Sequence, residues 1–343
     1  MKKFISLIIL TLISLSGFAQ KDEFVGFYKG DIVGLSKIPW DLTRTVYGEV
    51  YRVKDEYRLR LVGHIFSRCT NYFIKEGLKA NDGVINFSGG GRLSVSKGTI
   101  TPESITIVGK STKTDITLNM TRYNPPQSTL GQKAPDGATV IFDGTSTDNL
   151  EFKGAKPCTL EIVDGAIAID PKIKGAKDGA VVRSSVYTKE SFAGAFKLHV
   201  EFMCPADSYH LLGQQRNNSG IYLGDYEVQV LDSFGLESLW DDCGAIYKQV
   251  APYRNACLEP GAWQTYDITF YPAEFEGNKL VKNPRVTVYQ NDIKVQHETE
   301  IETATAGAAS DPDKYKHPNK ALKIMLQEHK NKVQFRNIWI EKL

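Results

Sequence analysis

Residues 217–232 read NNSGIYLGDYEVQVLD, and this stretch carries the clearest structural signal in the chain. β-rich residues flank Gly224-Asp225, a pattern that predicts two antiparallel strands joined by a tight turn. Strict alternation along the second strand places Glu227 and Gln229 on one face and the valines between and after them on the other.

The alternation fails at Leu231, which falls on the polar face. A β-bulge near this residue would repair the pattern, because one extra residue reverses the facing of everything that follows. Asp232 would then share a face with Glu227 and Gln229. Two carboxylates and an amide pointing together suit proton transfer, whereas a solvated outer sheet face explains the same spacing equally well.

The N-terminal segment 1–20 is predicted to be a signal peptide. Lys2 and Lys3 precede an apolar run that ends in small residues, and this run is short for a membrane-spanning helix. We therefore expect an exported protein, periplasmic or secreted, with no membrane span. Lys+Arg 42 against Asp+Glu 40 is a balanced charge, which argues against a nucleic-acid partner.

The five cysteines are widely spaced and form no CxxC or Cys/His metal pattern. Cys243 and Cys257 could pair in an exported chain, but buried free thiols are the default expectation. The fold is therefore expected to depend on its hydrophobic core.

The chain reads as all-β, with two domains. Short β segments with Gly- or Asp-containing turns at about ten-residue spacing predict a small antiparallel accessory domain over residues 21–123. Residues 124–137 are rich in proline and glycine and predict an extended linker. Roughly a dozen short strands over residues 138–343, with no convincing helix, predict a two-sheet antiparallel jelly-roll sandwich.

Several motifs in the second domain occur together and in a fixed order. They are Phe142-Asp143-Gly144, Asn218-Ser219-Gly220-Ile221-Tyr222, Tyr226-Glu227-Val228-Gln229-Val230-Leu231-Asp232, Gly244-Ala245-Ile246-Tyr247, Ala251-Pro252, Trp263, Leu326-Gln327-Glu328-His329 and Arg336-Asn337-Ile338-Trp339. This series resembles the 3-keto-disaccharide hydrolase family, also described as 3-keto-glucoside 1,2-lyase / 3-keto-2-hydroxy-glucal hydratase domains, over about residues 138–343. The resemblance implies a concanavalin-like jelly roll that acts on glycosides oxidised by a separate oxidoreductase.

The chain departs from the family pattern at three places. Gly224-Asp225 stands where the family commonly has an arginine, which Arg216 could replace. Lys330 stands for a glycine, and Gln264 for an asparagine after the tryptophan. These departures concern substrate preference more than fold.

A ketone at sugar carbon 3 acidifies the hydrogen on carbon 2, so a base can remove it and the aglycone can leave carbon 1. Water then adds to the unsaturated sugar. This route needs a base, an acid and a stabiliser for the enolate oxygen. The catalytic candidates are Glu227, Asp232 and His329. The candidates for holding substrate are Arg216, Asn218, Tyr222, Gln229, Tyr247, Gln327 and Arg336.

Other functions remain open. A divalent metal held by His329 and Glu227 could act as the Lewis acid, although no cofactor is required by the spacing. The run from Glu227 to Asp232 also resembles the paired acids of laminarinase-type retaining glucanases, which need carboxyl groups about 5–5.5 Å apart. A third alternative is a non-catalytic carbohydrate-binding module that uses Tyr222, Trp240 and Tyr247 as stacking platforms.

Overall fold

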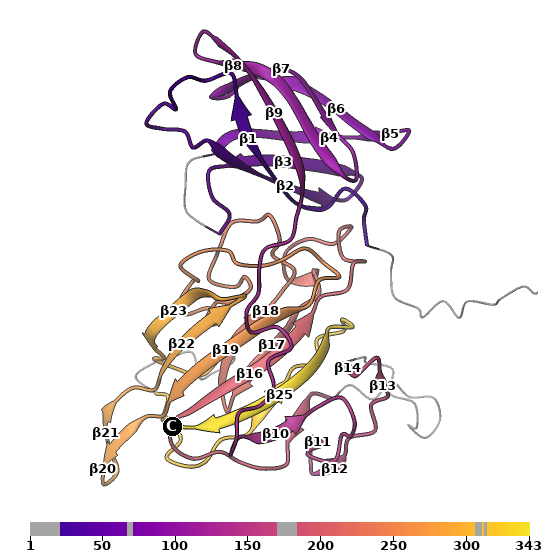
Figure 1. Cartoon of the computed structure of the whole chain (residues 1–343). Coiled ribbons are helices and arrows are strands. Elements are labelled where there is room, and N and C mark those ends of the chain that lie inside the picture. The colour runs from indigo at the N-terminus through magenta and orange to yellow at the C-terminus, as the bar shows by residue number, and fades with distance from the viewer. Residues whose placement is uncertain (1–20, 67–70, 170–183, 306–310, 312–313) are drawn as a thin grey trace, which may run out of the picture.

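The computed structural model describes residues 21–66, 71–169, 184–305, 311 and 314–343. The regular secondary structure of these residues is almost entirely β, as the sequence predicted, and Figure 1 shows one sheet stacked on the end of a sandwich. The predicted signal peptide and Cys69 lie outside the described residues. No helix among the described residues is long and apolar enough to cross a membrane.

The first part of the chain forms a nine-stranded antiparallel sheet in the order β4-β3-β2-β1-β9-β8-β7-β6-β5. The Arg92 N–H donates to the Tyr72 carbonyl at 3.0 Å, so the sheet curls and β4 meets the residues just before β7. Its strands are β1 (Gly26–Val33), β2 (Thr45–Val53), β3 (Glu56–Val62), β4 (Asn71–Leu78), β5 (Ala80–Asn81), β6 (Val84–Gly89), β7 (Leu93–Ile100), β8 (Ser104–Ser111) and β9 (Thr114–Tyr123).

The second part is a sandwich of two antiparallel sheets. The larger sheet runs β13-β14-β25-β16-β19-β22-β23, with β10 also paired to β25. Its strands are β10 (Thr139–Phe142), β13 (Ile162–Val163), β14 (Ala166–Ala168), β16 (Phe196–Met203), β19 (Gln264–Tyr271), β22 (Arg285–Gln290), β23 (Ile293–Glu300) and β25 (Gln334–Lys342).

The smaller sheet of the sandwich runs β12-β11-β15-β24-β17-β18. Its strands are β11 (Leu150–Phe152), β12 (Lys156–Pro157), β15 (Val186–Thr188), β17 (Ser219–Leu223), β18 (Tyr226–Val230) and β24 (Ile324–Leu326); β20 (Glu274–Glu276) and β21 (Lys279–Lys282) form a separate hairpin. A 3-10 turn, η2 (Gly213–Gln215), precedes β17. Two sheets packed face to face bury the alternate residues of each strand.

The predicted hairpin between β17 and β18 is confirmed. Leu223 pairs with Tyr226 across Gly224-Asp225, and Gly224 has a φ of 65°, which glycine adopts at no steric cost. Asn291-Asp292 forms the turn that joins β22 to β23, with both residues at positive φ. Short polar turn residues of this kind tolerate left-handed conformations.

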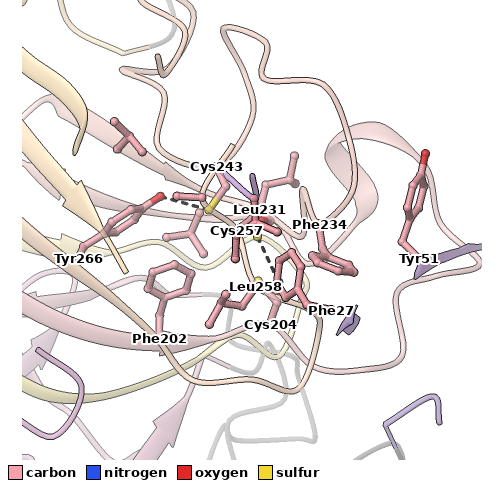
Figure 2. Packing of buried hydrophobic residues seen from close by; sticks show 14 of the residues in the cluster. Phe27, Tyr51, Phe202, Cys204, Leu231, Phe234, Cys243, Cys257, Leu258 and Tyr266 are labelled. Carbon is pink, nitrogen blue, oxygen red and sulfur yellow. Dashed lines mark hydrogen bonds between the residues drawn. The ribbon is translucent and has the colours of Figure 1, made fainter. Parts of the chain in front are cut away.

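Buried side chains form one continuous core that reaches from the first sheet into the sandwich. Figure 2 shows the part of this core where the two meet, with Phe27 of the first sheet beside Phe234 of the sandwich. The described cysteines, Cys158, Cys204, Cys243 and Cys257, are buried free thiols, which is the default expected from the sequence. The Cys243 sulfur lies 3.1 Å from the Tyr266 hydroxyl, and apolar side chains surround the pair.

The segment between β9 and β10 lies against the outer face of the larger sheet. The Gly131 N–H donates to Glu201 Oε1 at 2.6 Å, and the Gln132 carbonyl accepts from Asn337 Nδ2 at 2.9 Å. Ser128 Oγ donates to Asp292 at 2.8 Å. The proline- and glycine-rich segment has few apolar side chains, and these hydrogen bonds, most of them from its backbone, hold it against the larger sheet.

Candidate active site

Four polar side chains gather on one face of the smaller sheet: Tyr222, Glu227, Gln229 and Gln327, here called the Glu227 cluster. Tyr222 of β17 pairs directly with Glu227 of β18, and Gly220 pairs with Gln229. The alternate residues Ile221 and Val228 point into the sandwich core. The pleat thus puts the polar residues on one side and the apolar ones on the other.

Glu227 is 2% exposed, and the Tyr222 hydroxyl donates a 2.8 Å hydrogen bond to its Oε2. Burial raises the pKa of Glu227 to about 7; the Tyr222 hydrogen bond and the charge of Lys248 oppose this rise. Desolvation disfavours the charged carboxylate, whereas a donor or a cation favours it. A carboxyl group with a pKa near neutrality can both take and return a proton.

A glycine opposite Glu227 makes room for this carboxyl group. A Cβ at Gly220 would lie 2.2 Å from Glu227 Oε1, so any larger residue at position 220 would displace the acid. The sequence run Ser219-Gly220-Ile221-Tyr222 therefore supplies both the space for the acid and its hydrogen-bond donor.

Two amides flank the acid with unpaired acceptor atoms. Gln327 Nε2 donates to the Tyr222 hydroxyl at 3.2 Å, and Gln229 Nε2 donates to Gln214 Oε1 at 3.0 Å and to the Asp241 carbonyl at 3.1 Å. The Oε1 atoms of Gln229 and Gln327 are buried without a hydrogen-bond partner among the described residues. An unpaired buried acceptor is costly, so both oxygens are suited to receive the hydroxyl groups of a bound ligand.

Two further predicted residues lie next to this cluster. The Tyr247 N–H donates to the Glu227 carbonyl at 3.2 Å, so the segment of Tyr247 runs beside β18. Asn218 Nδ2 donates at 2.7 Å to Gln214 Oε1, the same atom that accepts from Gln229. Asn218 acts on the cluster through Gln214.

The predicted bulge near Leu231 is wrong. β18 pairs in regular register up to Val230 and ends there, so Asp232 lies in the following loop. Its Oδ2 accepts from Arg216 at 2.7 Å and from Ser208 at 2.8 Å. Asp232 and Arg216 thus form a buried ion pair with each other, and Asp232 does not share the face of Glu227 as expected.

Arg336 lies in the other sheet, on β25, and not in the Glu227 cluster. Its Nε donates to Glu201 Oε2 at 2.7 Å, and its guanidinium carbon is 4.0 Å from the Trp263 ring centroid. His329 follows β24, which ends at Leu326, and its side chain is exposed. β24 is therefore too short to place His329, the third catalytic candidate, on one strand face with Gln327.

Glu201 and His199 share one face of β16, and the segment between β9 and β10 covers them. Burial favours the neutral forms of both groups. Hydrogen bonds with Asp267 and Glu201 nevertheless raise the pKa of His199. The pKa of Glu201 is lowered to about 2 by its hydrogen bonds with His199, Asn337, Arg336 and the Gly131 N–H. This charged network lies on the outer face of the larger sheet and holds the Gly131 N–H of the covering segment.

The metal site considered from the sequence does not fit the described residues. No group of three or more His, Cys, Asp or Glu side chains in the described ranges is arranged to hold a metal ion. The Glu227 carboxylate is instead engaged by the Tyr222 hydroxyl. We therefore derive no catalytic step through a metal.

Several residues of the site were not predicted. Gln214 and the Asp241 carbonyl hold Gln229, the Thr305 hydroxyl accepts from the Glu227 N–H at 2.9 Å, and the charge of Lys248 acts on Glu227. All four lie outside the strands, where hydrophobic alternation gives no information on facing. The polar character of these loops is the only sequence signal that could have indicated these residues.

An all-β sandwich with a buried, near-neutral carboxyl group and unpaired amide oxygens is compatible with a carbohydrate-active enzyme, and the comparisons with known proteins support this class. The family described as 3-keto-alpha-glucoside-1,2-lyase-like domain matches residues 137–341. The chain belongs to this family. The nine-stranded sheet precedes the matched residues.

Solved structures of similar proteins include one from Parabacteroides distasonis that is described as a proposed glycosyl hydrolase. It is 32% identical to this chain, with a TM-score of 0.53, over 62% of this chain and 86% of its own. A second such structure from that organism is 18% identical, with a TM-score of 0.42, over 61% of this chain and 94% of its own. No curated protein matches.

Proposed function

We propose that this enzyme cleaves glycosides that carry a ketone at carbon 3, by elimination followed by hydration. The observation that carries the proposal is the Glu227 carboxyl group, whose burial raises its pKa to about 7. A general base works best when its pKa is close to the operating pH, and one well-placed base contributes about 10²–10⁴-fold. The family to which the chain belongs supports the choice of substrate.

In the proposed reaction the Glu227 carboxylate removes the proton from carbon 2. The electron pair passes into an enolate at the carbon 3 ketone, then forms the double bond between carbons 1 and 2 as the aglycone leaves. The aglycone oxygen takes a proton from Glu227 or from water. Water then adds at carbon 1 while carbon 2 regains a proton, so the overall result is hydrolysis.

The neighbours of Glu227 have separate tasks. The Tyr222 hydroxyl orients the carboxylate, with which it makes a 2.8 Å hydrogen bond. The free oxygens of Gln229 and Gln327 accept sugar hydroxyl groups. Lys248, whose charge favours ionised Glu227, stabilises the negative charge that develops on the sugar.

The retaining-glucanase alternative is less well supported. That mechanism needs a second free carboxyl group about 5–5.5 Å from the first. Asp232, the acid considered for this role, is occupied by Arg216 and Ser208. Elimination from an activated carbon acid uses one carboxylate as the base and needs no second carboxyl group at this distance.

The proposal predicts that a 3-keto-glucoside is cleaved whereas its unoxidised parent glucoside is not. The measurement is release of the aglycone, with and without a chelator, for the wild type and Glu227→Gln. Cleavage of the parent alone would support a glucanase, and sugar binding with no turnover of either would support a lectin. We further propose that the protein acts outside the cytoplasm and receives its substrate from a separate oxidoreductase.

A further inference from the structure

The nine-stranded sheet makes specific contacts with two loops of the sandwich, here called loop A (204–218, between β16 and β17) and loop B (231–263, between β18 and β19). In loop A, the Tyr209 carbonyl accepts from the Lys54 N–H at 2.7 Å. The guanidinium carbon of Arg52 lies 3.9 Å from the Tyr209 ring centroid. Arg52 is held in turn by Asp22 at 2.9 Å.

Loop B meets the same sheet through an aromatic contact. The Phe27 and Phe234 rings are 5.1 Å apart at 85°, an edge-to-face pair that Figure 2 shows among the buried residues. Gly235 follows directly, with a φ of 72°, and a Cβ there would lie 2.3 Å from the Tyr51 ring. Only glycine allows loop B to approach Tyr51 this closely.

The same two loops reach the Glu227 cluster at their other ends. Five residues after Tyr209, the Gln214 side chain accepts from both Asn218 and Gln229 and donates to the Asp241 carbonyl at 2.7 Å. In loop B, the Asp241 carbonyl also accepts from Gln229. The side-chain amide of Gln229 is thus held entirely by loop residues, and this leaves its Oε1 free.

The loops are also tied to each other between the two ends. Asp232 of loop B accepts from Ser208 and Arg216 of loop A at 2.8 and 2.7 Å. Ser233 Oγ donates to Asp242 Oδ1 at 3.2 Å and so closes loop B on itself. These contacts connect Tyr209 and Phe234 at the sheet to Gln214 and Asp241 at the site through short, buried links.

We propose that the nine-stranded sheet is a positioning module for the active site: it holds loops A and B so that Gln214 and Asp241 fix the amide of Gln229 toward the sugar. Tyr209 and Phe234 are the positioning residues. This inference rests on the proposed role of the Glu227 cluster, but it assigns to the sheet a function that the family match, which begins at residue 137, does not cover.

The test compares Tyr209→Ala with Tyr209→Phe in the full-length protein. The Ala variant loses the ring that Arg52 covers, whereas the Phe variant keeps it. We expect Tyr209→Ala to raise KM for a 3-keto-glucoside about tenfold, the equivalent of one hydrogen bond, while kcat changes by less than about twofold. The KM of Tyr209→Phe should equal that of the wild type. Trp40→Ala is the matched control, because Trp40 lies in the connection between β1 and β2 of the same sheet and is 96% exposed.

Hydrogen exchange supplies a readout that does not require turnover. The backbone amides of residues 211–216, including those that donate to the Ser208, Leu212 and Gly213 carbonyls, should exchange at least about tenfold faster in Tyr209→Ala than in wild type or Tyr209→Phe. Unchanged exchange and unchanged KM in Tyr209→Ala would overturn the inference.

Gln229→Ala separates failure of the inference from failure of the proposed function. If Gln229→Ala raises KM but Tyr209→Ala changes neither KM nor exchange, the sheet does not position the site. If Gln229→Ala leaves KM unchanged, or if the wild type does not cleave the keto sugar, the proposed function is wrong, and the exchange comparison alone then decides whether the sheet holds the loops.

Discussion

Tyr222 donates its hydroxyl hydrogen to Glu227 Oε2 at 2.8 Å, across neighbouring strands of one hairpin. Directly opposite residues of an antiparallel pair have Cβ atoms about 4.5–5.5 Å apart, a separation that a tyrosine and a glutamate can bridge. The tyrosine faces a carboxyl group whose pKa burial raises to about 7. This pair therefore sets the protonation state on which the proposed chemistry depends.

Replacing the acid tests the cost of burying it. The folded protein keeps Glu227 protonated up to about pH 7, whereas the unfolded chain ionises near pH 4.5, so wild-type stability falls as the pH rises through this interval. Glu227→Gln has no charge to bury. Its unfolding free energy relative to wild type should therefore increase by about 3 kcal/mol between pH 4.5 and pH 8.

Urea unfolding at pH 4.5 and pH 8 measures this difference, and turnover is measured on the same samples. The variant should be more stable at pH 8 yet at least about 10²-fold less active. A variant that is active and equally stabilised at both pH values would contradict the assignment of Glu227 as a buried, ionisable base.

Removing the tyrosine hydroxyl should shift the pH profile. The hydrogen bond from Tyr222 lowers the pKa of Glu227, so Tyr222→Phe should move the acidic limb of kcat/KM to higher pH. A hydrogen bond to a charged group contributes about 1.5–3 kcal/mol, which corresponds to a shift of about one pH unit or more. The measurement is kcat/KM from pH 5 to pH 9.

Tyr253→Phe is the matched control for this experiment. Tyr253 is 45% exposed in loop B, and the same loss of a hydroxyl group there should leave the midpoint unchanged. A Tyr222→Phe profile with the wild-type midpoint would show that the limb does not report on Glu227.

Much of this site was predicted from the sequence because strand alternation determines facing. Tyr222, Glu227 and Gln229 were expected on one hairpin, and they lie there. The prediction failed for Asp232, because it assumed that the strand continued through a bulge. In the structure β18 ends at Val230, and Asp232 in the following loop forms an ion pair with the buried Arg216.

The remaining errors have the same physical origin. His329 lies beyond Leu326, where β24 ends, and Arg336 pairs with Glu201, a residue distant in sequence. Loop contacts and pairings between distant segments depend on tertiary packing, and the period-two alternation of a strand does not predict them. The contact between Gln214 and Gln229 is of this kind.

The Asp232–Arg216 pair should contribute to stability and not to the chemical step. Removing one partner from a buried ion pair leaves an uncompensated charge, so Asp232→Asn should lower the unfolding free energy by about 3 kcal/mol. The kcat of the folded variant should remain within about tenfold of wild type. A loss of kcat above about 10³-fold in protein that circular dichroism shows to be folded would instead favour a paired-carboxylate mechanism.

The outer-face network should stabilise the fold most between about pH 4.5 and 6.5. The pKa of Glu201 is lowered to about 2, so its contribution is present above its unfolded pKa and is lost as the pH falls toward 2. The pKa of His199 is raised, so its contribution is complete below about 6.5 and is lost as the pH rises through the folded value.

Glu201→Gln removes the charge that both His199 and Arg336 face. Its unfolding free energy should fall by about 2 kcal/mol at pH 5.5, by less at pH 9, and by least at pH 2.5, as urea titrations at the three pH values would show. Equal losses at all three would mean that packing, and not charge, connects Glu201 to the segment that covers it.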